Sequence, residues 1–285
     1  RANAGEYRDQ IELGEYTINQ YVEDILQDIY QKKPDLIAFS CYIWNIRHVR
    51  ELVRELRKVL PNVPIWLGGP ESSYDAKGLL ENYSEVTGVL VGEGEESFYE
   101  LCKFYDGKIE SLADVKGIAY REAGEVIVKP FELVKDLSTL KFAYEDFKDF
   151  EHKIIYYESS RGCPFSCSYC LSAIDKSVRF RDLEIVKNEL QIFIDEKVPQ
   201  VKFVDRTFNC KVSHAMAIWQ YIHEHDNGVT NFHFEVAADL ITEEELELFE
   251  KMRPGLIQLE IGVQSTNEDT VCEIRRKMNF SKVGE

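Results

Sequence analysis

The sequence predicts an α/β protein of two domains, a doubly wound (Rossmann-like) parallel sheet followed by a partial barrel of alternating strands and helices. Three observations support this prediction. The chain has 285 residues, which is enough for two domains. Apolar runs of strand length alternate with segments whose apolar residues recur at helical spacing, and this alternation is interrupted once near the middle of the chain. The expected division is residues 1–130 for the first domain, 131–150 for a linker and 151–285 for the barrel.

The first domain alternates helical and strand patterns. Val22, Ile25 and Ile29 recur at helical spacing before Pro34 ends the first helix. The expected helices are residues 21–33, 45–60, 76–83 and 95–107, and the expected buried strands are 35–40, 65–69 and 86–92. Strands that alternate with helices form a parallel sheet covered on both faces, which is the doubly wound arrangement.

The rhythm breaks at residues 114–130, where two alternating apolar runs flank Arg-Glu-Ala-Gly-Glu as the strands of a hairpin would. Periodicity is then lost over 131–150, which we interpret as a linker.

The βα rhythm resumes in the second domain. Strands are expected at 153–160, 201–205, 232–237 and 256–264, with helices at 182–197, 213–225, 242–252 and from about Asn267. Four such units make half of an eight-fold, TIM-like barrel. The sequence stops within a helical pattern, and the first domain lacks the strand and helix with which such domains usually begin. The chain is therefore expected to be a fragment of a longer protein, with the barrel truncated.

Composition narrows the function classes. There are 34 Lys and Arg against 51 Asp and Glu, a formal charge of −17, which argues against nucleic acid as a partner because such partners need a concentrated basic surface. The sequence contains neither an apolar run long enough to span a membrane nor a signal peptide, so a cytoplasmic location is expected. Seven cysteines are too few for a disulfide scaffold, and three lie within eight residues, which indicates a metal site in a reducing compartment.

These three cysteines, Cys163, Cys167 and Cys170, form a C-x3-C-x2-C pattern directly after a predicted strand. Thiolates ligate iron–sulfur clusters and zinc, and this spacing lets one short loop surround a single centre. Three ligands would leave one corner of a four-iron cluster open for a substrate or cosubstrate. The alternative is a zinc site whose fourth ligand is Cys210 or a distant histidine.

The loop resembles the signature of the radical S-adenosylmethionine superfamily, with Tyr169 as the aromatic before the third cysteine and Arg-Gly before the first. The resemblance implies a [4Fe-4S] cluster held by Cys163, Cys167 and Cys170. It also implies that S-adenosylmethionine chelates the fourth iron and is cleaved by one electron to methionine and a 5′-deoxyadenosyl radical. Such a site must exclude water and oxygen, and the protein's part is to position and shield the cofactors.

The carboxyl ends of the later strands carry the other expected S-adenosylmethionine contacts, because barrel chemistry lies at those ends. By resemblance they are Tyr169, Asp205 (beside the amino group), Glu235, Gln264 and Ser265 (ribose and carboxylate). Glu260 is expected to share a strand face with Gln264. The alternative for each of Asp205, Glu235 and Glu260 is an internal ion pair or cap.

The first domain resembles the cobalamin-binding domain that precedes the barrel in one branch of this superfamily. Ser40, in Ser-Cys-Tyr, is followed at the family's spacing by Gly68-Gly69, with Tyr42 in place of the usual leucine. Gly92, Glu93 and Gly94 end the next strand, and glycines at such an edge let a bulky ligand approach the backbone. The family's cobalt-ligating Asp-x-His-x-x-Gly element would fall near or before Arg1 and is not in this sequence.

Together the resemblances imply cobalamin-dependent methyl transfer to an unactivated carbon. Two alternatives stay open. One is an oxidative cyclase or oxidoreductase of the anaerobic magnesium-protoporphyrin monomethyl ester cyclase type, and the other is a non-catalytic iron–sulfur or cobalamin sensor. The expected partners are a small-molecule or peptide substrate and an electron donor such as flavodoxin or ferredoxin. The sequence does not distinguish a lipid, a porphyrin, a peptide or a sugar as substrate.

Overall fold

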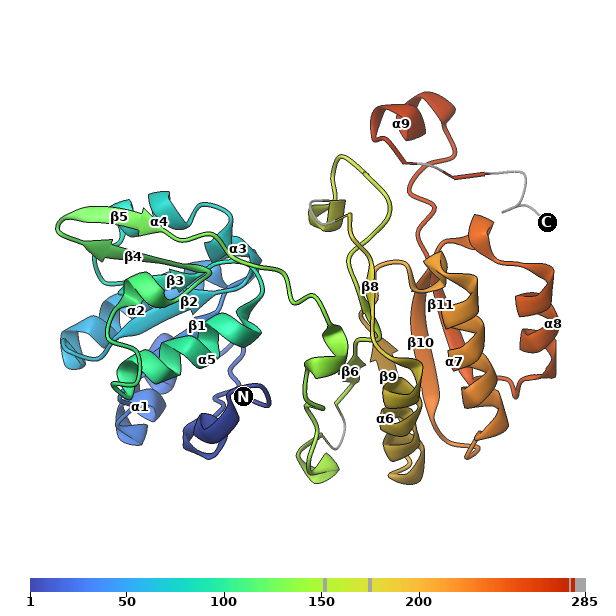
Figure 1. Ribbon diagram of the computed structural model, residues 1–285, viewed down its shortest axis with the longest axis horizontal. Helices are drawn as coiled ribbons and strands as arrows, with labels where there is room; N and C mark the ends of the chain where they lie inside the picture. The colour runs from blue at the N-terminus through green and yellow to red at the C-terminus, as the bar shows by residue number, and fades with distance from the viewer. Residues whose placement is uncertain (151–152, 174–175, 277, 280–285) are drawn as a thin grey trace. The chain divides into compact units, whose positions relative to one another are not determined.

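The computed structural model describes residues 1–150, 153–173, 176–276 and 278–279 (Figure 1). The chain divides into two compact units, Arg1–Val134 and Lys135–Glu285, each with its own hydrophobic core. Within the described ranges, no helix combines the length and apolar character needed to cross a membrane.

The first unit is built on one five-stranded sheet in the order β1-β2-β3-β4-β5. Its strands are β1 (Ile37–Ser40), β2 (Ile65–Gly68), β3 (Gly88–Leu90), β4 (Ile118–Glu122) and β5 (Glu125–Val128). The first three are parallel, as predicted. The predicted hairpin is β4–β5, and it joins the same sheet antiparallel to β3.

Helices cover both faces of this sheet. They are α1 (Val22–Lys32), α2 (Ile46–Val59), α3 (Pro70–Ser73), α4 (Ala76–Asn82) and α5 (Gly94–Tyr105). Alternate residues of β2 face opposite ways, so Ile65 and Leu67 pack with α1, α2 and α4, whereas Trp66 packs with Leu101 of α5. The short α3 and the 3-10 helix η1 (Gly5–Gln10) were not expected.

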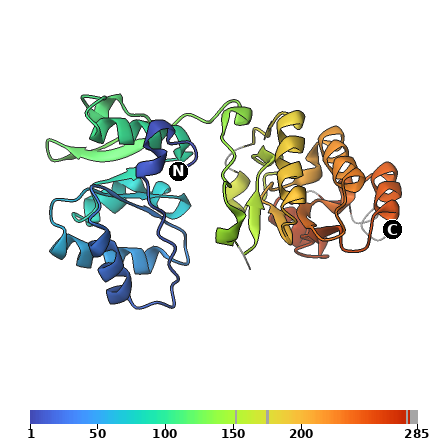
Figure 2. The ribbon, with the colours of Figure 1, turned by 90° about the horizontal axis from the view of Figure 1, so that it is seen from below.

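The second unit contains a four-stranded parallel sheet in the order β11-β10-β9-β6, which is the order expected of half a barrel. The strands are β6 (Ile155–Tyr157), β9 (Gln200–Phe203), β10 (Asn231–Val236) and β11 (Ile257–Ile261). Three helices stand in a row along one face (Figure 2), namely α6 (Leu183–Asp195), α7 (Val212–Glu224) and α8 (Glu243–Lys251). A short helix, α9 (Glu268–Glu273), follows β11.

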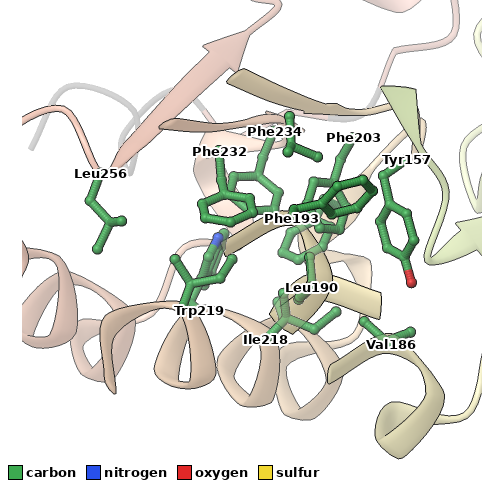
Figure 3. Close-up of a cluster of buried hydrophobic side chains, with 14 of the residues drawn as sticks. Tyr157, Val186, Leu190, Phe193, Phe203, Ile218, Trp219, Phe232, Phe234 and Leu256 are labelled. Atoms are coloured by element: carbon green, nitrogen blue, oxygen red, sulfur yellow. The ribbon is translucent and has the colours of Figure 1, made fainter. Parts of the chain in front are cut away.

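Aromatic side chains form the core between this sheet and its helices (Figure 3). Phe203 and Phe234 of adjacent strands lie 4.5 Å apart, centroid to centroid, and Trp219 of α7 meets Phe234 edge-on at 5.8 Å. Because strand residues alternate, this packing turns Lys202 and Glu235 to the opposite face of the sheet.

The segment predicted as a linker packs onto the second unit. Four of its aromatic residues contact the core of that unit: Phe142, Tyr144, Phe147 and Phe150. Phe193 of α6 is the partner of three of these rings, with centroids 5.3 Å from Phe142, 5.7 Å from Tyr144 and 5.8 Å from Phe147, and Phe150 packs against Tyr144. The segment lacks sequence periodicity because it crosses α6 as an irregular strap, which buries apolar rings without a helical or strand repeat.

Candidate cofactor-binding sites

The three clustered cysteines lie on a loop closed by a short antiparallel pair, β7 (Ser160–Arg161) and β8 (Arg179–Phe180). The chain leaves β7 through Gly162, whose φ is +102° and where any Cβ would lie 2.2 Å from the carbonyl oxygen of Ser177, so glycine is required. Cys163 and Cys167 are buried, Cys170 is exposed, and none is in a disulfide. One loop therefore presents three free thiols.

This donor set fits an iron–sulfur cluster. Within the described parts of the chain, no three His, Cys, Asp or Glu side chains converge as a single metal ion would require. A four-iron cluster has its ligands on separate irons, so the three thiols of one loop could each bind a different iron.

Asp205 lies at the predicted strand end, beside the stem of this loop, and its contacts are internal. Its side chain is buried, and both oxygens accept hydrogen bonds: Oδ2 from the Ser159 amide at 3.0 Å, Oδ1 from the hydroxyls of Ser159 at 2.7 Å and Ser160 at 2.6 Å. Burial raises the pKa of Asp205 to about 6, against the opposing effect of these donors. With three hydrogen bonds to its carboxylate, Asp205 joins the end of β9 to the stem of the cysteine loop, which is the internal role that the sequence left open.

A second buried contact anchors the other end of the stem. Arg181 follows β8 and forms a bidentate ion pair with Glu189 of α6, with N–O distances of 2.6 and 2.8 Å. The hydroxyl of Tyr157 donates to the same carboxylate at 2.6 Å. All three side chains are buried. A buried Arg–Glu pair with these extra hydrogen bonds has its charges satisfied and fixes the stem on α6.

His214 of α7 extends the Asp205 network, with its Nε2 3.3 Å from the Ser159 hydroxyl oxygen. Since that hydroxyl donates to Asp205, the histidine must supply the proton of this contact. Burial lowers the pKa of His214 to about 4. The folded state therefore holds a neutral imidazole across a pH range in which the unfolded chain is protonated.

A pH dependence of stability follows. Because the folded pKa lies below the unfolded one, His214 contributes stability that is present above pH 6.5 and lost as the pH falls towards 4. The raised pKa of Asp205 acts in the opposite direction between about pH 4 and 6 and partly masks this loss. Relative to the original chain, His214→Gln is expected to gain about 3 kcal/mol in unfolding free energy between pH 7 and pH 4. Urea titrations of both proteins at several pH values measure it. An unchanging difference would contradict the buried neutral histidine.

The face of the sheet away from the helices carries an ion-pair cluster. Glu260 accepts from Lys202 at 2.9 Å and lies 3.1 Å from the Nε2 of His233, while Glu235 is 3.9 Å from the Lys202 ammonium group. Lys202 lowers the pKa of Glu260. Both carboxylates face Lys202, which is the internal ion pair that the sequence left open for Glu235 and Glu260. The strand face predicted for Glu260 and Gln264 does not extend that far, because β11 ends at Ile261. Glu235 keeps the longer and weaker contact.

The end of β11 approaches the outer part of the cysteine loop. Arg276 donates to the Tyr169 hydroxyl at 3.2 Å and to the carbonyl of Gly262, and the Ser168 amide bonds to Ile274. Gln264 has a left-handed backbone, with φ +67°. The hydroxyl of Ser265 accepts from the Asn267 amide just before α9. Tyr169 and the Gln264–Ser265 turn are therefore brought to one region through Arg276.

Sequence reasoning missed Arg276, because no local pattern relates it to residues about a hundred positions earlier. Beside these contacts lies an open depression of about 670 Å³, whose lining includes Phe165 of the cysteine loop, Leu240, Val271 and Arg276. It gives the cysteine loop a neighbouring space with both apolar and charged walls.

In the first unit, predicted ligand-binding residues gather at the carboxyl edge of the parallel strands. Ser40 pairs with Gly68 across β1 and β2, and the Cys41 amide bonds to the Gly68 carbonyl at 2.7 Å. Gly69 has φ +94°, and a Cβ there would lie 2.6 Å from the Cys41 carbonyl oxygen. Gly69 is thus required by the backbone, whereas a Cβ at Gly68 would meet only ordinary contacts.

The two glycines predicted at the end of the next strand, Gly92 and Gly94, differ in their surroundings. Gly92 has φ +80° and packs against Phe131, so its lack of a side chain serves the fold. Gly94 has open space at its Cβ position. Glu93 has an internal contact, because its Oε2 accepts from the Val134 amide at 2.7 Å and so holds the chain that leaves the sheet.

An exposed aromatic patch follows Ser40. Tyr42 and Trp44 stack with ring centroids 4.5 Å apart, and Trp44 and the intervening Ile43 are 63% and 78% exposed. The side chain of Asn45 stabilises this turn with two hydrogen bonds. Its Nδ2 donates to the Ser40 carbonyl at 2.9 Å, and its Oδ1 accepts from the Tyr42 backbone amide at 2.7 Å. The sequence singled out only Tyr42, although three large apolar residues between a strand and a helix are themselves a signal. The edge thus offers a flat apolar surface beside glycine backbone.

Two family models match the two units. The B12 binding domain model matches residues 5–102, and the Radical SAM superfamily model matches residues 157–284. The chain belongs to the cobalamin-binding branch of the radical S-adenosylmethionine superfamily. The first unit is its B12-binding domain, and the second is its radical SAM domain. The predicted fold class and family are confirmed.

Known proteins of this branch resemble the chain along most of its length. It is 28% identical over 203 residues to the cobalamin-dependent radical SAM methyltransferase TokK of Streptomyces tokunonensis, covering 65% of this chain and 30% of TokK. It is 25% identical over 300 residues to the anaerobic magnesium-protoporphyrin IX monomethyl ester cyclase of Rubrivivax gelatinosus, covering 96% of this chain and 53% of the cyclase.

Among solved structures, OxsB with aqua-cobalamin and S-adenosylmethionine bound superposes with a TM-score of 0.79 at 19% identity, over 99% of this chain and 43% of OxsB. The chain thus spans about a third to a half of the length of these three proteins. The matched domains confirm the predicted cofactor classes: a radical SAM domain uses a [4Fe-4S] cluster and S-adenosylmethionine, and a B12-binding domain binds cobalamin.

Proposed function

We propose that this chain is the cofactor-binding part of an enzyme that reductively cleaves S-adenosylmethionine and transfers a methyl group from cobalamin to an unactivated carbon of a small-molecule or peptide substrate. The observation that carries the proposal is the three-thiol loop, held at the strand ends of a radical SAM domain by Asp205 and Arg181. When bound, the cluster supplies the electron that breaks the sulfonium bond. We infer a cytoplasmic enzyme that receives this electron from a flavodoxin or ferredoxin.

Residues of the chain would ligate the cluster, contact S-adenosylmethionine and hold the cysteine loop in position. Cys163, Cys167 and Cys170 would ligate three irons and leave the fourth for S-adenosylmethionine. Tyr169, Glu235, Gln264 and Ser265 would contact that cosubstrate, with Arg276 orienting the Tyr169 hydroxyl. The Asp205 and Arg181 contacts hold the loop in place, and the buried aromatic core behind the sheet excludes water from that side.

In the B12-binding domain, Ser40, Gly68, Gly69 and Gly94 would face cobalamin, because they share the carboxyl edge of the parallel strands. Tyr42, with its neighbour Trp44, would supply apolar contact area for a flat macrocycle. Gly92 and Glu93 would shape this edge through the contacts that hold the following chain.

The deciding experiment uses the full-length protein, purified without oxygen from cells supplied with cobalamin. Electron paramagnetic resonance of the reduced protein is expected to show a four-iron signal that shifts when S-adenosylmethionine is added, together with cob(II)alamin. Incubation with a reductant should also release 5′-deoxyadenosine. A shifting cluster signal without cobalamin would contradict methyl transfer but keep radical cleavage. Bound zinc, or a cluster that releases no 5′-deoxyadenosine, would contradict the catalytic proposal.

The second candidate is an oxidative cyclase, favoured by the Rubrivivax cyclase match across 96% of this chain. The two activities differ in a measurable product. A methyltransferase would take the methyl group from a second S-adenosylmethionine and release S-adenosylhomocysteine, so formation of that product would support methyl transfer. Release of 5′-deoxyadenosine without S-adenosylhomocysteine would favour cyclisation.

A further inference from the structure

A hydroxyl group lies beside the first cysteine of the loop. Thr207 Oγ1 is 3.5 Å from Cys163 Sγ, and both residues are buried, at 7% and 8% exposure. Thr207 follows Asp205 by two residues and lies just after β9. It is 44 residues from Cys163 in the sequence. The contact is therefore produced by the fold and not by the loop itself.

Several hydrogen bonds fix this contact. The Val204 amide bonds to the Tyr157 carbonyl at 2.8 Å, which extends the β6–β9 pairing, and Asp205 then binds Ser159 and Ser160. The chain segments leading to Cys163 and Thr207 thus run side by side with little freedom. These hydrogen bonds keep the backbone at Thr207 close to the segment that leads to Cys163.

The proton arrangement changes when the sulfur is a ligand. In the structure the Thr207 hydroxyl donates to the Arg206 carbonyl at 2.8 Å, and a thiol at Cys163 can donate to the threonine oxygen. A cysteine that ligates iron is a thiolate without a proton, so it can only accept. The hydroxyl proton of Thr207 is then the one available for this contact, and a charge-assisted bond to sulfur favours its rotation away from Arg206.

We infer that Thr207 donates a hydrogen bond to the Cys163 thiolate of the bound cluster and thereby raises the cluster's reduction potential. This inference rests on the proposed function, since it requires a cluster at Cys163. Hydrogen bonds to cluster sulfurs withdraw negative charge from the iron and stabilise the reduced state. Thr207 is thus a positioning residue, placed just after β9, that acts on electron entry before any substrate chemistry.

The test compares Thr207→Val, which keeps the shape and removes the hydroxyl, with Thr207→Ser, which keeps the hydroxyl. Both are made in the full-length protein with its cluster reconstituted without oxygen. Redox titration followed by electron paramagnetic resonance should give a more negative midpoint potential for the valine variant and an unchanged one for the serine variant. Iron per chain should be equal in all three. Resonance Raman spectra should show a shifted Fe–S(Cys) band in the valine variant alone.

The outcomes separate the two proposals. Equal midpoint potentials and unshifted Raman bands at equal iron content would overturn the role of Thr207 and leave the proposed function intact. An original chain that takes up no four-iron cluster would overturn the proposed function. If the valine variant holds too little iron, Thr207→Ala, which adds no bulk beside the sulfur, is titrated in its place with the same criteria.

Discussion

Replacement of Cys163, Cys167 or Cys170 by alanine is expected to remove the four-iron signal and to lower 5′-deoxyadenosine formation at least about 100-fold. Mutation of groups that merely orient metal ligands typically lowers metal affinity or activity about 10–100-fold, so loss of a ligand itself should exceed that range. The three thiols come from one loop, and the other described cysteines lie on different elements. The measurements are iron and sulfide per chain and the yield of 5′-deoxyadenosine.

Two further cysteine variants are the controls for this prediction. Cys102 lies half-buried on α5 of the first unit, so Cys102→Ala should leave iron content and cleavage unchanged. Cys210 lies near enough to Cys163 for the two thiols to affect each other electrostatically, and its pKa is raised to about 11, mainly by burial. Cys210→Ala should also retain iron. Loss of metal in the Cys210 variant, with zinc in the original chain, would instead support the four-ligand zinc alternative.

Replacement of Asp205 by alanine is expected to lower the unfolding free energy of the second unit by about 3–5 kcal/mol. The change removes three hydrogen bonds at once and leaves the Ser159 amide and two hydroxyls buried without their acceptor. Iron retention should fall with it, because the stem of the cysteine loop loses its link to β9. Denaturant unfolding of the cluster-free chain, followed by fluorescence of the buried Trp219, measures the stability change.

Matched variants identify the source of that loss. Ser160→Ala removes one donor and leaves Asp205 two, so we expect a decrease of about 1 kcal/mol. Asp195→Ala removes a carboxylate from the exposed end of α6 and should change stability by less than about 0.5 kcal/mol. If Asp205→Ala unfolded at the same denaturant concentration as Asp195→Ala, the buried network would not stabilise the unit.

Most elements of the fold could be predicted because their signals are local. Apolar periodicity predicted α2 and α6, and the alternating runs around Arg121–Glu125 predicted the β4–β5 hairpin. The cysteine loop was placed correctly after β6 for the same reason. The short pair β7–β8 was missed because two residues are too few to show a period.

The contacts of the site could be predicted less well, because they join residues far apart in the chain. The position of Asp205 at a strand end was predicted, but its hydrogen bonds to Ser159 and Ser160 depend on the register between β6 and β9. Likewise, nothing in the sequence around Glu93 indicates that its carboxylate accepts a hydrogen bond from the amide of Val134, 41 residues later. Arg276 has no local pattern at all. In each case the deciding fact is a hydrogen bond that only the folded chain reveals.

The aromatic strap across α6 has a consequence for dividing the protein into separately expressed parts. Secondary-structure rhythm suggests a cut near residue 151, but such a fragment would leave behind Phe142, Tyr144 and Phe147. Phe193 would then lose the rings that cover it and present an apolar surface to solvent. A radical SAM fragment that begins at Lys135 keeps these rings and has the better prospect of staying monodisperse during cluster reconstitution.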